Sequence, residues 1–229
     1  MKISIIIPCF NEEKTISLVI NKILTNYTGE KEIIVIDDCS NDKTREILKS
    51  DLENKIDKLI FNEKNYGKGF SIRKGINIAE GDVILIQDAD LEYDPSDYDK
   101  LLKPIEKGVA DVVYGSRFLG GEEKRVLYFW HTIGNKFLTT FSNMFSNLNL
   151  TDMEVGYKLF KSNVIKDIDL IENRFGFEPE ITAKIAKKKI RIFEVGISYY
   201  GRKYEDGKKI TWKDGVSALR CIIKYNLFN

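Results

Sequence analysis

The fold is decided by the stretch Val83-Ile84-Leu85-Ile86-Gln87-Asp88-Ala89-Asp90-Leu91-Glu92, in which a continuous apolar run leads into three carboxylates. A strand that is apolar on both faces is typical of a parallel sheet covered by helices on both sides. Ligands of such a sheet bind beyond the carboxyl ends of its strands. The sequence therefore predicts a buried strand that delivers Asp88, Asp90 and Glu92 to a binding edge.

Short apolar runs of the same kind alternate with helical stretches through the first half of the chain. Strands are expected at Ile3–Ile7, Glu32–Asp37, Lys58–Phe61, Val83–Gln87 and Asp111–Tyr114. Helices are expected between them at Glu12–Asn26, Asp42–Leu52, Gly67–Ala79 and Ser96–Lys107. This alternation is typical of the α/β class with a mostly parallel central sheet.

The second half of the chain departs from this rhythm. It begins with an apolar, aromatic-rich helical face at Val126–Leu150 and ends with an amphipathic helix at Lys213–Tyr225. Between them we expect two strand-like pieces and one helix, at Gly156–Phe160, Arg191–Val195 and Glu178–Lys188. Core packing and contact with a membrane are equally good interpretations of the first helix. For the last helix the sequence favours docking at a membrane interface. No linker or repeat divides residues 1–229, which indicates a single domain.

Composition limits the kind of protein. The chain has 229 residues, with 36 Lys and Arg against 35 Asp and Glu, a formal net charge of +1 and 43% hydrophobic residues. A nearly neutral chain has no global attraction to nucleic acid, so phosphate binding must come from local clusters such as the basic loop Gly201–Lys209. Three widely spaced cysteines make no disulfide framework, which favours a reducing compartment. No apolar run reaches the ~18 residues of a membrane span, so we expect no integral membrane segment.

The Asp-x-Asp-x-Glu pattern after the buried strand indicates a site for a hard cation. In an extended chain alternate residues point the same way, so Asp88, Asp90 and Glu92 can converge on one ion. Carboxylate oxygens are preferred by Mg²⁺ and Mn²⁺, which usually share them with substrate phosphates. The alternative is a solvated turn with acidic helix caps. The position at a strand end favours the metal site.

Several motifs occur in order along the chain. The first four are Ile5-Ile6-Ile7-Pro8-Cys9-Phe10-Asn11-Glu12, Val35-Ile36-Asp37-Asp38-Cys39-Ser40-Asn41-Asp42, Asn65-Tyr66-Gly67-Lys68-Gly69 and Gln87-Asp88-Ala89-Asp90-Leu91-Glu92. The later ones are Gly115-Ser116-Arg117-Phe118, Thr151-Asp152-Met153-Glu154-Val155-Gly156-Tyr157-Lys158-Leu159-Phe160, Phe175-Gly176-Phe177-Glu178, and Gly201-Arg202 through Gly207-Lys208-Lys209-Ile210. Together they resemble the family 2 inverting glycosyltransferases with the GT-A fold. The most similar subgroup is that of the dolichyl- and polyprenyl-phosphate sugar synthases, which includes dolichyl-phosphate mannosyltransferase.

The resemblance implies roles for individual residues. In residues 1–120, the half that would bind the nucleotide sugar, the implied contacts are Pro8, Asn11, Glu12, Asp37, Asp38, Lys68, Asp88, Ala89 and Asp90. The implied ligands of Mg²⁺ or Mn²⁺ are Asp88, Asp90 and Glu92. In residues 121–229, the acceptor-binding half with interfacial helices, Arg202 and Lys208 would hold the acceptor phosphate. The implied catalytic residues are Asp152, near the reacting centre, and Arg117, which would also contact phosphate.

The implied reaction moves a hexose, mannose or glucose, from GDP-mannose or UDP-glucose to a polyprenyl or dolichyl phosphate. The protein would then be cytoplasmic and peripheral on the cytoplasmic membrane face, with membrane contact of its own or through an integral membrane partner. It would not bind nucleic acid. Two departures from the family pattern leave the donor sugar open: Val155 replaces a usual Cys beside the extra carboxylate Glu154, and Glu92 replaces a usual Gln.

Two further interpretations stay open at this point. One keeps the fold and the donor but uses a soluble saccharide or protein acceptor. The other is a catalytically degenerate nucleotide-binding subunit of a membrane complex.

Overall fold

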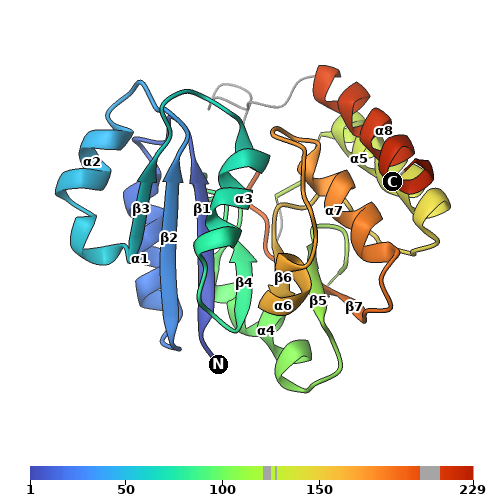
Figure 1. Cartoon of the computed structure of the whole chain (residues 1–229), viewed down its shortest axis with the longest axis horizontal. Helices are drawn as coiled ribbons and strands as arrows, with labels where there is room; N and C mark the ends of the chain where they lie inside the picture. Colours follow the sequence, from blue (N-terminus) through green and yellow to red (C-terminus); the bar gives the residue numbers. More distant parts are fainter. Residues whose placement is uncertain (121–124, 127, 202–211, 229) are drawn as a thin grey trace.

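One sheet runs through the middle of the molecule (Figure 1). The computed structural model describes residues 1–120, 125–126, 128–201 and 212–228. The strands are β1 (Ile3–Cys9), β2 (Lys31–Asp37), β3 (Lys58–Phe61), β4 (Val83–Ile86), β5 (Val112–Ser116), β6 (Lys158–Lys161) and β7 (Ile192–Gly196). They lie in the order β3-β2-β1-β4-β6-β5-β7. The predicted α/β class with a mostly parallel central sheet is confirmed.

The direction of β6 determines which segments meet. β1 pairs parallel with β2 and β4, β2 with β3, and β5 with β7. β6, in contrast, pairs antiparallel with both β4 and β5. It therefore begins at the edge of the sheet where its neighbours end, which is the upper edge in Figure 1. We call this the carboxyl edge, because the loops after β1, β2, β4 and β5 meet the segment before β6 there.

Helices cover both faces of the sheet. They are α1 (Ile16–Asn26), α2 (Thr44–Ser50), α3 (Lys68–Ile78), α4 (Tyr98–Glu106), α5 (Phe129–Ser146), α6 (Ser162–Lys166), α7 (Phe177–Ala186) and α8 (Trp212–Leu227), with 3₁₀ turns at Glu53–Lys55 and Pro95–Asp97. In Figure 1, α3 and α6 lie in front of the sheet and α1 lies behind it. Because it is covered on both sides, β4 is buried along its whole length and β1 almost so. This explains their continuous apolar sequences.

Close contact between α3 and the sheet depends on Gly75. A Cβ at this position would lie 2.5 Å from Ile6 Cγ2 and 3.1 Å from Ile36 Cδ1. Both isoleucines are fully buried, as is Ile72 on the same helix. Burying an isoleucine side chain contributes about 1.5–3 kcal/mol. Buried isoleucines of the sheet and of α3 therefore stabilise the packing of this helix on the sheet.

Some element boundaries differ from the sequence predictions. α1 begins at Ile16 rather than at Glu12. The residues before it form the loop after β1, which is hydrogen-bonded to Ser40 and Thr44 after β2. β6 begins at Lys158 rather than at Gly156. The sequence does not predict α6, because its five residues are too few to show a helical period.

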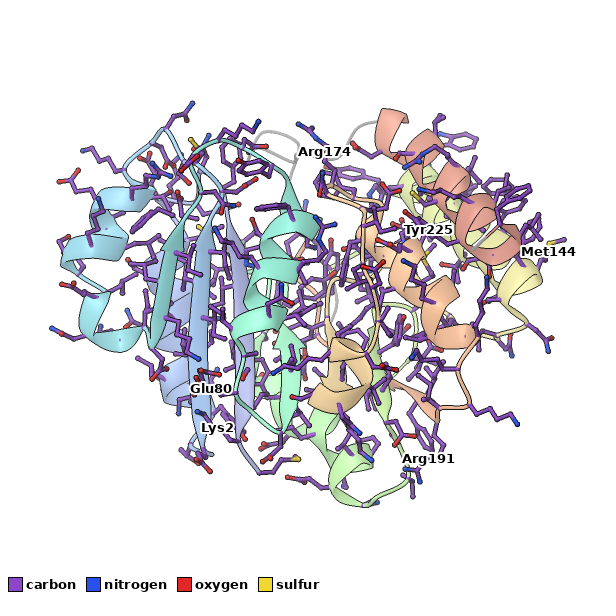
Figure 2. The ribbon with its side chains drawn as sticks, in the orientation of Figure 1. Lys2, Glu80, Met144, Arg174, Arg191 and Tyr225 are labelled. Carbon is purple, nitrogen blue, oxygen red and sulfur yellow. The ribbon has the colours of Figure 1, made fainter. Side chains whose placement is uncertain are left out.

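The position of α5 answers the question left open for the aromatic helix. Trp130, Phe137 and Met144 are 79%, 57% and 76% exposed, and Met144 lies at the outer margin of the molecule in Figure 2. The buried residues of α5 are instead Thr139 and Ser142. Leu138 and Phe141 lie partly buried against the hydrophobic core, so core packing is correct for these two side chains and wrong for Trp130, Phe137 and Met144.

The last helix, α8, packs against α5 and α7. It buries Ala218, Cys221, Ile222 and Tyr225 and leaves Val216, Ile223 and Leu227 exposed. α5 and α8 thus present neighbouring apolar side chains to solvent. Across the described ranges, no helix has both the length and the hydropathy that crossing a membrane requires.

Candidate functional site

Hydrogen bonds tie the loops after β1 and β2 together at the carboxyl edge. Asn11, whose φ of 52° is left-handed, accepts a hydrogen bond from Asn41 N at Oδ1 (2.9 Å) and donates its own N–H to Ser40 Oγ (2.9 Å). Glu12 N donates to Thr44 Oγ1 (2.9 Å). Asn11 and Glu12 thus shape the predicted nucleotide pocket. Their contact with a nucleotide stays a prediction.

Asp37 and Asp38 are buried and bonded within the chain. Asp37 Oδ2 accepts a hydrogen bond from Arg45 Nε (2.6 Å). Asp38 accepts hydrogen bonds from the backbone N–H groups of Tyr66 (3.0 Å) and Gly67 (2.7 Å). Gly67 has a φ of 104°, which a residue without a Cβ adopts freely. Asp38 therefore fixes the turn that starts α3, and contact of either carboxylate with a base or ribose stays a prediction.

The two apolar residues among the predicted nucleotide contacts lie on neighbouring strands. Pro8 is half-buried on β1, and Ala89 is buried in the turn after β4. Because β1 and β4 are adjacent, both residues lie at the carboxyl edge. Their contact with a donor stays a prediction.

Lys68, the first residue of α3, connects two carboxylates from distant parts of the chain. Its Nζ lies 2.8 Å from Asp88 Oδ1 and 3.1 Å from Glu178 Oε1 on α7. Burial lowers the pKa of Lys68, but the two carboxylates outweigh this effect, so the pKa lies above its ordinary value. We call this arrangement of Lys68, Asp88 and Glu178 the lysine bridge. The sequence predicts Lys68 and Asp88 for the site but gives Glu178 no role.

The turn after β4 is not extended, so Asp88, Asp90 and Glu92 do not point the same way through the alternation of an extended chain. Leu91 has a left-handed φ of 63°, and Asp90 Oδ1 accepts a hydrogen bond from Glu92 N (3.1 Å). Glu92 Oε2 accepts a hydrogen bond from Tyr199 OH (2.8 Å). Within the described residues, no group of three or more His, Cys, Asp or Glu side chains is arranged to hold a metal ion.

The residues at this turn nevertheless have the chemistry that a divalent cation needs. Asp88 Oδ1 already binds a cation, the ammonium of Lys68. Gly156 comes so close that a Cβ there would lie 2.4 Å from Asp88 Oδ2, so the glycine leaves room for this carboxylate. Carboxylate oxygens are the ligands that Mg²⁺ and Mn²⁺ prefer. The donor types fit such an ion, and ligation by Asp88, Asp90 and Glu92 stays a prediction.

Arg117 and Asp152 form a buried ion pair with two parallel hydrogen bonds. Arg117 donates from Nε to Asp152 Oδ2 and from Nη2 to Oδ1, both at 2.7 Å, and its backbone N–H donates to Oδ2 at 3.1 Å. Burial lowers the pKa of Arg117, and Asp152 raises it by more, so the guanidinium stays charged. Two-pronged pairs of this kind fix the orientation of both groups. The sequence predicts both residues for the reacting centre but not that they bind each other.

The turn that carries Asp152 is held from two sides. Glu194 on β7 accepts hydrogen bonds from the N–H groups of Thr151 (2.9 Å) and Asp152 (3.2 Å). On the other side, Thr139 of α5 accepts a hydrogen bond at Oγ1 from Met153 N (3.1 Å). Sequence analysis misses both supports. The available signal for Glu194 is a single carboxylate within the strand Ile192–Gly196.

Another group of charged side chains lies on the segment before β6, on the first residue of β6 and on α7. The fully buried Lys158 donates from Nζ to the carbonyl oxygens of Met153 (3.0 Å) and Val155. Glu154 lies on the turn between these two carbonyls. Burial raises the pKa of Glu154, and the charge of Glu178 raises it further. The sequence indicates Glu154 only as an extra carboxylate.

Arg202 and Lys208, the predicted contacts of the acceptor phosphate, lie outside the described residues. The residue that precedes them, Gly201, accepts a hydrogen bond at its carbonyl from Arg125 Nη1 (2.6 Å). The nearby Tyr199 ring lies 5.4 Å from the guanidinium of Arg117. Gly201 is thus two residues from a ring that contacts the Arg117–Asp152 pair, and phosphate binding by Arg202 and Lys208 stays a prediction.

The chain is similar to curated transferases that act on lipid phosphates. It is 28% identical over 213 residues to the undecaprenyl-phosphate 4-deoxy-4-formamido-L-arabinose transferase of Photorhabdus laumondii, with 90% of this chain and 62% of the relative covered. It is 29% identical over 218 residues to the dolichol-phosphate mannosyltransferase of Pyrococcus furiosus, with 92% and 61% covered. The chain therefore spans about three fifths of the length of these relatives.

The fold recurs in a solved structure, that of glucosyl-3-phosphoglycerate synthase from Mycobacterium tuberculosis in complex with Mn²⁺ and UDP-glucose. The TM-score is 0.76 at 16% sequence identity, and the match covers 98% of this chain and 79% of that chain. At this identity the likeness shows the fold, and the predicted GT-A arrangement is confirmed. The description Glycosyl transferase family 2 matches residues 4–169, which include the lysine of the bridge and the Arg117–Asp152 pair. The chain therefore belongs to glycosyl transferase family 2.

Proposed function

We propose that the chain is a divalent-cation-dependent inverting glycosyltransferase that moves glucose or mannose from a nucleoside diphosphate sugar to a polyprenyl or dolichyl phosphate. It would act peripherally, on the cytoplasmic face of a membrane. The family and the names of the curated relatives support transfer of a sugar to a lipid phosphate. The Mn²⁺ and UDP-glucose in the solved structure of the same fold support the donor and the cation.

The observation that carries the acceptor assignment is that one helix serves both the charged site and an apolar surface. The inner side of α5 holds the Asp152 turn through Thr139. The outer side exposes aromatic rings, among them Trp130 and Phe137. Apolar helix faces of this kind bind in the interface of a bilayer. A lipid phosphate that arrives along α5 would thus meet Asp152 at the inner side of the same helix.

The Arg117–Asp152 pair favours an acceptor that needs no general base. Both oxygens of Asp152 accept hydrogen bonds from Arg117, so this carboxylate is not placed to take a proton from a hydroxyl group. A phosphate monoester has a second pKa of about 6 and is already largely ionised at neutral pH. Its oxygen can attack without losing a proton to the protein. In-line attack from the face opposite the leaving group inverts the anomeric carbon.

The lysine bridge would lie at the leaving-group side of this reaction. Lys68 would supply positive charge to the diphosphate from a buried position, where charges interact more strongly than in water. When bound, a divalent cation stabilises the charge that develops on the diphosphate. Asp88, Asp90 and Glu92 would hold that ion.

Organic extraction of transferred label tests the proposal. The full chain is incubated with Mn²⁺, a short polyprenyl phosphate and either labelled UDP-glucose or labelled GDP-mannose. We expect label in the organic phase with one donor, loss of this signal with EDTA, and its return with excess Mn²⁺. A Glu80→Gln variant, altered at the far end of the sheet near Lys2 in Figure 2, serves as the matched control and should keep full activity.

Other outcomes would contradict this assignment in distinguishable ways. Label that appears only on a soluble saccharide, a phosphoglycerate or a protein would favour the soluble-acceptor alternative. Nucleotide-sugar binding without transfer to any acceptor would favour the degenerate subunit.

A further inference from the structure

We infer that Glu178 is a positioning residue for Lys68, which it takes over from Asp88 when a divalent cation binds at the turn after β4. Lys68 and the cation compete for Asp88, and Glu178 determines how easily Lys68 gives way. Glu178 is not among the predicted nucleotide, metal or acceptor contacts, and its role here rests on the proposed use of a divalent cation.

Lys68 occupies the carboxylate that the cation would use. Its Nζ lies 2.8 Å from Asp88 Oδ1 and 3.2 Å from Asp88 Oδ2. The two side chains are 17% and 18% exposed, so water screens this contact only weakly. An ammonium held against both oxygens repels a second cation at the same carboxylate. Asp88 therefore binds a divalent cation well only if Lys68 moves away.

The surroundings of Asp88 leave the carboxylate little freedom to turn away from Lys68. A Cβ at Gly156 would lie 2.4 Å from Asp88 Oδ2. Gly156 is in turn held by the buried Tyr93, whose hydroxyl accepts a hydrogen bond from the glycine N–H (3.0 Å). Lys68, in contrast, carries its charge at the end of a flexible four-carbon chain. The ammonium is thus the partner that moves.

Glu178 offers Lys68 an acceptor that is already in contact and only half used. Its Oε1 lies 3.1 Å from Lys68 Nζ. Its Oε2 is buried and has no hydrogen-bond partner among the described residues. Buried polar atoms are normally satisfied, and an ammonium has three N–H donors to distribute. Once released from Asp88, Lys68 can bind both oxygens of Glu178 and direct its remaining N–H to a diphosphate.

The backbone fixes the distance between the two helices that carry this pair. Glu178 lies in the first turn of α7, is 4% exposed, and accepts a hydrogen bond at its carbonyl from Thr182 Oγ1 (2.7 Å). Near the start of α3, Phe70 N donates to the carbonyl of Asn173 before α7 (3.0 Å). Transfer from Asp88 to Glu178 therefore needs only a rotation of the Lys68 side chain.

This arrangement makes cation binding depend on the diphosphate. Without a nucleotide, Lys68 neutralises Asp88 and disfavours a divalent cation there. A bound diphosphate offers Lys68 further negative oxygens, so the ammonium leaves Asp88 at a lower cost. Glu178 reduces this cost as well, because the buried ammonium stays paired throughout the change.

Titration of Mn²⁺ by electron paramagnetic resonance, which reports the free ion, tests this on the full chain without any acceptor. Dissociation constants for Mn²⁺ are measured without nucleotide and with saturating UDP or GDP. The variants are Lys68→Met, Glu178→Gln and the double variant Lys68→Met/Glu178→Gln. The matched control is Glu106→Gln, an exposed carboxylate at the end of α4. Thermal unfolding shows which variants are folded, and Lys68→Gln replaces Lys68→Met if the latter is not.

Without nucleotide, Lys68→Met should bind Mn²⁺ roughly tenfold more tightly than the wild type, because Asp88 no longer faces a resident cation. Glu178→Gln should bind Mn²⁺ several-fold more weakly, because Lys68 then stays on Asp88. The same change should have no effect in the Lys68→Met background, since Glu178 acts through Lys68. Nucleotide should tighten Mn²⁺ binding more in the wild type than in Lys68→Met. The control should match the wild type.

Two results would overturn this role of Glu178 and leave the proposed transfer intact. An equal loss of Mn²⁺ affinity on Glu178→Gln with and without Lys68 would mean that Glu178 acts on the ion directly, by its charge or as a ligand. A Lys68→Met variant that binds Mn²⁺ no more tightly than the wild type would mean that Lys68 does not compete for Asp88. Wild type that binds no Mn²⁺ even with nucleotide would instead overturn the cation in the proposed function together with this inference.

Discussion

Arg117 and Asp152 meet through two parallel hydrogen bonds, and both residues are buried. A buried pair of this kind adds little net stability, because the cost of removing both charges from water offsets their attraction. Removing one partner is a different matter, since the other charge then stays buried without compensation. The contribution of this pair to the free energy of unfolding can therefore be measured apart from its role in the reaction.

An Arg117→Met variant is expected to lower the free energy of unfolding by about 3–5 kcal/mol, the usual cost of leaving a buried charge unpaired. The double variant Arg117→Met/Asp152→Asn should recover part of this loss, because it no longer buries an isolated carboxylate. Urea denaturation of the wild type, both single variants and the double variant measures the coupling. Additive losses would contradict the pairing.

Asp88 is the residue at which the lysine bridge and the predicted cation site coincide. An Asp88→Asn variant should bind UDP-glucose roughly tenfold or more weakly in the presence of Mn²⁺, because a hard cation loses a charged oxygen ligand. In EDTA the variant and the wild type should differ much less. Calorimetry with and without Mn²⁺ gives both comparisons, and Asp99→Asn, an exposed change on α4, is the matched control. The same loss of affinity with and without Mn²⁺ would argue against ligation by this carboxylate.

The positions of Asp88 and Asp152 could be predicted from sequence, whereas the contacts that they make could not. Asp88 follows an apolar run, and an acidic residue at the end of a buried strand is a local signal. The contact between Lys68 and Glu178 joins residues far apart in the chain, and no local pattern encodes it. The extended geometry expected of Asp88, Asp90 and Glu92 does not occur, because the left-handed Leu91 interrupts the alternation, and their ligation of a metal stays a prediction.

Asp111 shows how one side chain can join elements at the end of the sheet away from the carboxyl edge. It directly precedes β5 and accepts hydrogen bonds from Lys161 Nζ (2.8 Å), Arg191 Nε (3.0 Å) and the backbone N–H of Arg191 (3.0 Å). Arg191 lies at the lower right of the molecule in Figure 2. The hydrogen bonds of Arg191, opposed by burial and helped by Lys161, hold the pKa of Asp111 well below its usual range.

This lowered pKa predicts a pH dependence of stability with a definite sign. Because the folded state prefers the ionised carboxylate, the stability from Asp111 is present above its unfolded pKa of about 3.9 and is lost as the pH falls toward the folded value. The unfolding free energy of wild type should exceed that of Asp111→Asn at pH 7, and the difference should shrink from pH 4 to pH 3. Urea denaturation at these pH values measures the difference. A constant difference would contradict the assignment.

At the scale of elements, the apolar runs are strong enough to predict five strands of the first half. The strand direction of β6 is not encoded in the same way. Three of its four residues, Lys158, Leu159 and Phe160, are buried, and periodicity does not indicate the direction in which a buried strand runs. Yet the reversed direction of β6 is what brings the Asp152 turn to the carboxyl edge.

Exposed apolar side chains gather on α5 and α8, at one end of the whole molecule, and α1 and α2 lie at the other end (Figure 1). A Trp130→Ser/Phe137→Ser variant should therefore lose binding to phospholipid vesicles, since each ring buried in the interface contributes apolar area. Vesicle flotation measures this loss. The free energy of unfolding should change by less than about 0.5 kcal/mol per site, because both rings are exposed in the folded protein.

Leu18 offers a matched control for this surface. It is 53% exposed on α1, far from α5, so Leu18→Ser removes an exposed apolar side chain without touching the proposed interface. It should leave flotation unchanged. If Leu18→Ser reduced flotation as much as Trp130→Ser/Phe137→Ser does, vesicle binding would reflect non-specific hydrophobic adsorption rather than the α5 and α8 surface.

The lysine bridge also bears on how members of the family could be recombined in the laboratory. Lys68 contacts Glu178, and the backbone N–H of Phe70 donates a hydrogen bond to the carbonyl of Asn173 at 3.0 Å. The start of α3 therefore forms an interface, here called the seam, with residues 173–178. A chimera that takes residues 1–120 from one parent and the rest from another would cut across this seam. Crossover libraries should therefore inherit residues 173–178 from the same parent as α3, even though the two segments are separated by half of the chain.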